Sequence, residues 1–223
     1  MRNLSDTAAE VRNLVKLLTD SGIAVAYNPC IERRRSGTVY LTWPGEPPVV
    51  GNSGFCTLEH YRQCLRAGTF TVVLFDGALL QMWFAFQRGE LRKQSLCYHP
   101  CPIELGTGQL EQGNPLGDLQ DRISGPDLDL RLRSPMRFDY DQDSAGPGHS
   151  ASHVHLISAS CRCPVVARIS IGHFVRFVFS HFYPTEWETH PFLRTWRQHD
   201  ADRTIRPEEE QVLHFACRRP TQT

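Results

Sequence analysis

Hydrophobic positions in this chain recur with two periods, and the period predicts which segments are helical and which are extended. Over 7–22 and 57–68, apolar residues return every three or four positions, so we expect a helix in each. The most apolar segment, 170–183, is predicted as a largely buried helix capped by Ser170. Its valines and phenylalanines are also compatible with a buried strand.

Short runs of β-branched and aromatic residues predict the strands. The clearest run, 69–99, predicts a three-strand meander with turns at Asp76-Gly77 and at Arg88-Gly89-Glu90. Further strands are expected over 23–27, 38–43, 128–133, 136–141 and 153–158, a Pro/Gly-rich loop over 43–54, and two closing helices over 186–199 and 207–217.

These elements predict an α+β fold: a mainly antiparallel sheet, made of the meander plus further strands, with helices at the N- and C-terminal ends. The chain has 223 residues, 40% of them hydrophobic, which suffices for one core, so we expect a single domain over 1–223. Residues from about 100 to 127 lack periodicity and are expected to form a long irregular loop.

Candidate chemistry lies where polar and apolar side chains alternate in two successive strands. Asp139 and Asp141 share one face of the first strand, and His153 and His155 share one face of the second. If the strands pair and bury their apolar residues in one core, the carboxylates and imidazoles meet on the other face. Asp139, His153 and His155 could then bind a divalent metal ion, with His149 within reach. Alternatively, the four candidate catalytic residues Asp139, Asp141, His153 and His155 could perform acid–base chemistry near neutral pH. Two alternatives need no site: the face could be an ordinary solvent-exposed one, or an Asp could pair with a His only to satisfy hydrogen bonds at a sheet edge.

The helix expected over 170–183 has a narrow polar stripe of His173, Arg176 and Ser180. In a buried helix this stripe would line a crevice, where Arg176 could bind a phosphate or carboxylate as a fifth catalytic candidate. Alternatively, the stripe is simply the side of the helix that faces solvent.

The eight cysteines suggest a second possibility for a metal ion. Cys97 and Cys101, with His99 between them, and the pair Cys161 and Cys163 offer enough ligands for zinc. Their spacings differ from the usual zinc patterns, so buried or surface thiols are the alternative. No phosphate-binding loop or dinucleotide fingerprint is present, so no cofactor other than a divalent metal is indicated.

Charge and hydropathy limit the partners. Lys and Arg total 24 and balance the 24 Asp and Glu, so the net charge does not support nucleic-acid binding beyond local basic patches such as 33–35. The chain shows no signal peptide and no apolar run of membrane-spanning length. We therefore expect no membrane partner and a cytoplasmic location.

The run FDYD…HSASHVHLISASCRCPV…GHFVRFVFSHFYP resembles a bacterial family catalogued as domain of unknown function 2290. An aspartate-bearing strand, a His-x-His strand, a Cys-Pro turn and a Phe-rich helix carry the resemblance. It implies a soluble bacterial protein with no assigned activity, and it supplies no catalytic residues. Families of this kind often lie beside mobile-element or defence genes.

Two functions fit these observations, and whether the protein is an enzyme stays open. The first is a non-catalytic component of a multi-gene bacterial system, which binds a protein partner through aromatics such as Trp187, Phe192 and Trp196. The second is a small metal-dependent hydrolase of the phosphodiesterase or nuclease type. In that case the Asp/His face would hold the metal, and Arg176 would contact phosphate.

Overall fold

The computed structural model of the protein describes residues 3–45, 57–111, 113–158, 160–199 and 201–216. This part of the chain forms a sheet of nine strands, paired antiparallel, with six helices, which confirms the expected α+β class. The helices are α1 (Leu4–Asp20), α2 (Leu58–Arg66), α3 (Pro115–Arg122), α4 (Ile171–Phe182), α5 (Pro184–Thr189) and α6 (Pro191–Thr195). The strands are β1 (Ala24–Tyr27), β2 (Ile31–Arg35), β3 (Thr38–Thr42), β4 (Val72–Leu74), β5 (Leu79–Gln87), β6 (Glu90–His99), β7 (Met136–Asp141), β8 (Ser152–Leu156) and β9 (Cys163–Pro164).

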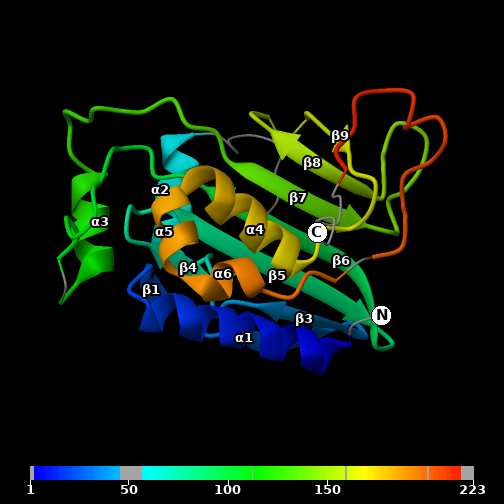
Figure 1. Ribbon diagram of the computed structural model, residues 1–223, viewed down its shortest axis with the longest axis horizontal. Helices are drawn as coiled ribbons and strands as arrows, with labels where there is room; N and C mark the ends of the chain where they lie inside the picture. Colours follow the sequence, from blue (N-terminus) through cyan, green and yellow to red (C-terminus); the bar gives the residue numbers. More distant parts are fainter. Residues whose placement is uncertain (1–2, 46–56, 112, 159, 200, 217–223) are drawn as a thin grey trace.

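Strand β5 lies at the centre of the sheet. It pairs along its length with β6 on one side, and with β4 and then β3 on the other. β1 and β2 extend the sheet beyond β4 and β3, while β7, β8 and β9 follow β6 in order. The long β5–β6–β7 ribbon is visible behind the helices in Figure 1.

The predicted meander turns where the sequence indicated. Gly77 has φ +81°, and a Cβ atom added to it would lie 2.9 Å from Sγ of Cys101, so only glycine fits without strain. In the second turn, Arg88 and Gly89 both have positive φ, which suits the tight reversal between β5 and β6.

Helices cover both faces of the sheet, and each face has its own core. α1 and α4–α6 pack on one face, here called the α4 face, over a core that includes Phe138 and Val154 (Figure 1). α2 and α3 pack on the opposite α2 face, with Tyr61 and Leu79 in a smaller core. Leu79 and Leu80 are consecutive and belong to different cores, as alternation along a strand requires.

The segment expected as an irregular loop over 100–127 contains helix α3. The Asn114 side chain accepts a hydrogen bond from the backbone N–H of Gly117, and Pro115 occupies the first turn. The helix has only two turns and buries one side chain, Leu119, so its apolar periodicity is too short to stand out in the sequence.

The strand expected over 128–133 is wrong. Within this segment only Leu130 forms an isolated bridge, to Ile103, while the side chains of Leu130 and Leu132 are exposed. Alternating leucines predict a strand only where a core exists to receive them. Conversely, the sequence analysis did not predict β2, a charged edge strand that pairs with β3.

The closing helices also differ from the prediction. The helix expected over 186–199 is broken at Pro191 into α5 and α6, because proline lacks the N–H that would continue the helix. Residues 207–216, the described part of the helix expected over 207–217, form turns. There the Glu209 carboxylate accepts hydrogen bonds from Arg206 and Ser150, which stabilises a local turn. The loop expected over 43–54 lies outside the described residues from residue 46 onward.

Candidate metal centre

The register of β7 and β8 brings the predicted Asp/His face together. Asp139 pairs with His153, and Arg137 pairs with His155. The intervening residues Phe138 and Val154 are buried in the α4 core, so the polar side chains point to the α2 face. The two histidines are 3% and 2% exposed, so this face is not the open, solvated surface that was one alternative.

Three ligand atoms converge at this point. Nε2 of His155 lies 3.1 Å from Nε2 of His153 and 3.2 Å from Oδ2 of Asp139, and the third side of the triangle is 4.0 Å. A point about 2.0 Å from all three atoms satisfies those distances, which is the usual length of a bond from zinc to nitrogen or oxygen. One metal ion could therefore contact all three ligand atoms.

Hydrogen bonds outside the triangle orient the ligands. Nδ1 of His153 lies 2.9 Å from the carbonyl oxygen of Ser150, which can only accept, so Nδ1 carries the proton and Nε2 keeps its lone pair. Burial lowers the pKa of His153 to about 4, so the ring is neutral at pH 7. The ring of His149 lies 5.1 Å from that of His153, as its place in the intervening loop suggested.

Asp139 is held ionised although it is largely buried. Burial alone would raise its pKa, but hydrogen bonds from His155 and Ser95 and the charge of Arg137 bring the pKa below the ordinary value. The Ser95 hydroxyl donates to Oδ1 at 2.8 Å, and Nε of Arg137 donates to Oδ2 at 2.9 Å. The carboxylate is thus available as an anionic ligand.

Two of the predicted site residues lie elsewhere. Asp141 shares the face of Asp139, but its carboxylate accepts hydrogen bonds from Lys93 and from Ser144, and so caps the turn after β7. Arg176 does not lie with the Asp/His cluster, because α4 packs on the other face of the sheet. There Arg176 lies over the ring of Trp187, 5.4 Å from its centroid.

Sequence reasoning missed Ser95 and Arg137. Arg137 is two residues before Asp139 on the same strand, so the period-two pattern already placed it on the same face. Ser95 carries no signal of its own, because its place opposite Asp139 follows only from the β6–β7 register.

The cysteine pairs do not assemble into the zinc site considered from their spacing. In the described part of the chain, Cys97 and Cys101 share no ligand group with Cys161 and Cys163. Cys101 is buried behind Gly77 in the α2 core, which accords with a packing role.

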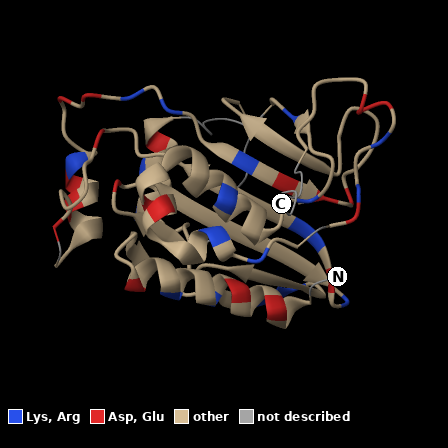
Figure 2. Cartoon of the chain, in the orientation of Figure 1, with Lys and Arg blue, Asp and Glu red and all other residues tan. Residues whose placement is uncertain are grey.

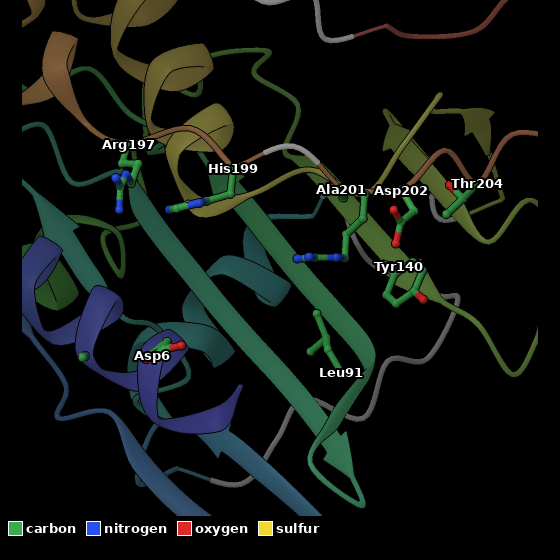
Figure 3. Close-up of a pocket in the computed structure, with 10 residues that line it drawn as sticks. Asp6, Leu91, Tyr140, Arg197, His199, Ala201, Asp202 and Thr204 are labelled. Carbon is green, nitrogen blue, oxygen red and sulfur yellow. The ribbon is translucent and has the colours of Figure 1, made fainter. Parts of the chain in front are cut away.

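A cavity of about 700 Å³ lies on the α4 face, away from the metal centre. Figure 3 shows its lining from the start of α1, from β6 and β7, and from the segment after α6. Arg168 donates a hydrogen bond to Gln94 and lies over Tyr140. Charged and polar lining residues also include Asp6, Arg197, His199 and Asp202. Acidic and basic residues are interspersed along the described elements (Figure 2).

Fold and site together define an α+β protein with two histidines and one aspartate converging on a single antiparallel sheet. The chain belongs to the DUF2290 family of uncharacterized conserved proteins, whose sequence model matches residues 23–217. Neither a curated protein nor a solved structure matches it. Among the helices of the described residues, none combines the length and apolarity needed to cross a bilayer.

Proposed function

We propose that this protein is a metal-dependent hydrolase whose metal ion is bound by Asp139, His153 and His155. The observation that carries the proposal is the triangle of 3.1, 3.2 and 4.0 Å formed by their ligand atoms. A divalent cation would bind all three groups at once, in place of the contacts that the two imidazoles and the carboxylate make with one another.

Three protein ligands leave at least one coordination position for water, as in catalytic zinc sites. A metal ion at this point would supply a nucleophilic hydroxide near neutral pH. Arg137 adds a positive charge beside the centre, in the role first expected of Arg176. That charge favours an anionic substrate. Phosphodiesters, including those of nucleic acids, are the substrates we propose, because a metal-activated water can attack the phosphorus while the guanidinium stabilises the negative charge.

The experiment compares metal content and turnover in matched variants. Purified wild-type protein should bind one equivalent of Zn²⁺ or Mn²⁺ at this centre and hydrolyse bis(p-nitrophenyl) phosphate. Asp139→Asn and His153→Ala should lose both properties. Asp141→Asn is the control, because it changes a carboxylate on the same face that is engaged by Lys93. Equal metal binding by wild type and Asp139→Asn would remove the proposal.

A protein-binding role in a multi-gene bacterial system, with a cytoplasmic location and a link to defence or mobile elements, is the second candidate. One observation favours it: Val212, Leu213 and Phe215 in the C-terminal segment are exposed. The aromatics first considered as anchors, Trp187, Phe192 and Trp196, instead pack against the large core. Tagged protein expressed in its native host tests this role. A monomer that retains no specific partner, and behaves identically after Leu213→Ser, would count against it.

A further inference from the structure

We propose that His60, Cys64 and His99 form a second metal site, selective for zinc and separate from the Asp139 centre. The three residues come from α2 and from the last position of β6, on the α2 face of the sheet. Their candidate ligand atoms all lie within 4.8 Å of one another.

The helix supplies the first two ligands. His60 and Cys64 are four residues apart on α2, so their side chains lie one above the other on the same face of the helix. Sγ of Cys64 is 3.7 Å from Nε2 of His60. In a tetrahedral zinc site, bonds of 2.3 Å to sulfur and 2.0 Å to nitrogen place these two atoms about 3.5 Å apart. The pair therefore already has nearly the spacing that zinc imposes.

His99 supplies the third ligand, and it is an unusual residue to bury. It is 4% exposed, and its Nδ1 is buried without a hydrogen-bond partner in the described part of the chain. Its ring stacks against His60 at 5.5 Å and meets the edge of Tyr61 at 5.3 Å. A buried polar group left without a partner costs about 1–3 kcal/mol, so a metal ion here would give the imidazole the polar contact that its surroundings lack.

Burial raises the pKa of the free Cys64 thiol, but one hydrogen bond to the sulfur would support a metal-bound thiolate. The buried amide of Gln81 donates to Sγ of Cys64 at 3.4 Å and is fixed by a second hydrogen bond to the carbonyl of Thr69 at 2.6 Å. Outer contacts of this kind orient a ligand and stabilise its charged form. His60 is only half-buried, which leaves a route by which the metal can reach the site.

One thiolate and two imidazoles form a softer ligand set than that of the Asp139 centre, which contains no sulfur. Polar contacts of α2 with the rest of the described chain include those of Tyr61 with Gly77 and of Arg62 with the end of α3. Bound zinc would add a direct link between α2 and β6. The second site would thus stabilise the α2 layer rather than perform chemistry.

Cobalt substitution distinguishes the two sites, because only a thiolate ligand gives a sulfur-to-cobalt charge-transfer band in the near ultraviolet. Metal-free full-length protein titrated with Co²⁺ should develop this band. Cys64→Ser should abolish it, whereas Asp139→Asn should retain it, and Cys161→Ser is the matched control for a thiol elsewhere. His60→Ala changes a half-buried ligand and should weaken Zn²⁺ binding about 10–100-fold with the core intact.

A wild-type protein without the band would overturn the proposal, and so would a band that survives Cys64→Ser and His60→Ala but disappears in Cys161→Ser. If Cys64→Ser fails to fold, the His60→Ala titration still decides. Since the Asp139 centre has no thiolate, either result leaves the proposed hydrolase to be judged by its own variants.

Discussion

His153 and His155 point their Nε2 atoms at each other across 3.1 Å, although they are two residues apart on the same strand. Side chains at such positions leave the strand about 7 Å apart, so the rings must lean together, and their centroids lie 4.8 Å apart. At that distance one nitrogen donates and the other accepts. His153 is fixed as the acceptor by its contact with Ser150, so His155 holds the proton that a metal ion would displace.

Stability should therefore depend on pH below neutrality. Burial lowers the pKa of His153 to about 4 and that of His99 to about 3, whereas both titrate near 6.5 in the unfolded chain. The unfolded state then binds more protons, so the stability present above pH 6.5 is lost as the pH falls toward 4. Each histidine contributes a slope of up to about 1.4 kcal/mol per pH unit.

Urea unfolding of metal-free protein between pH 4.5 and 7.5 measures this slope. His153→Gln should reduce it, since the variant has no titrating group at that position. An unchanged slope in the variant would show that His153 is accessible to protons in the folded state.

The hydroxyl of Ser95 should matter for metal affinity without touching the metal. It holds Oδ1 of Asp139, and outer contacts of this kind typically change affinity about 10–100-fold. Calorimetric titration of Ser95→Ala with Zn²⁺ should show weaker binding of that order. Ser144→Ala is the matched control, because it removes a similar hydrogen bond to Asp141. Equal losses in both variants would argue against a specific role for Ser95.

Substitutions of Arg137 and Arg176, which lie on opposite faces of the sheet, test which face binds the substrate. Arg137→Gln removes the charge beside Asp139, so we expect kcat/KM for bis(p-nitrophenyl) phosphate to fall about 100-fold. Arg176→Gln removes an equal charge from α4, where it lies over Trp187, and should leave kcat/KM unchanged. A loss of activity confined to Arg176→Gln would place the substrate on the α4 face instead.

Two glycines with the same backbone conformation should respond differently to substitution. Gly77 and Gly89 have φ of +81° and +82°, but a Cβ atom meets Sγ of Cys101 at 2.9 Å in the first case and nothing within 4 Å in the second. We expect Gly89→Ala to cost about 1 kcal/mol of unfolding free energy, and Gly77→Ala to cost about 2–3 kcal/mol. Thermal and urea unfolding of both variants measure the difference, and equal costs would mean that Cys101 moves aside freely.

Three of the five candidates lie together because a strand fixes its faces by alternation alone. Because Phe138 and Val154 are buried in the core on one face of the sheet, the side chains of Asp139, His153 and His155 must point to the opposite face. The periodicity of α4 placed Arg176 on the polar side of the helix. It could not tell which face of the sheet the helix covers, so the distance from Arg176 to the Asp/His face could not be predicted.

The fold class followed from the same reasoning. The strand expected over 128–133 failed because its leucines have no core to pack against, as at Leu132, and the helix expected over 186–199 failed because Pro191 interrupts it.

The second site could not be predicted in the same way. His60 and Cys64 have helical spacing that is visible in the sequence, but their partner lies at the end of a strand 35 residues further along the chain. Only the packing of α2 against β6 brings His99 to them, and that packing depends on the small core around Tyr61 and Leu79.

Strand β7 separates the cavity on the α4 face from the Asp/His cluster on the α2 face, and only the backbone of the strand lies between them. Tyr140 lines the 700 Å³ cavity, while its neighbour Asp139 faces the opposite way toward the histidines. A compound that fills the cavity would press on one residue and shift the next, without competing for the same space. A small molecule bound in the cavity would therefore be expected to change the affinity of the proposed metal site from behind the sheet.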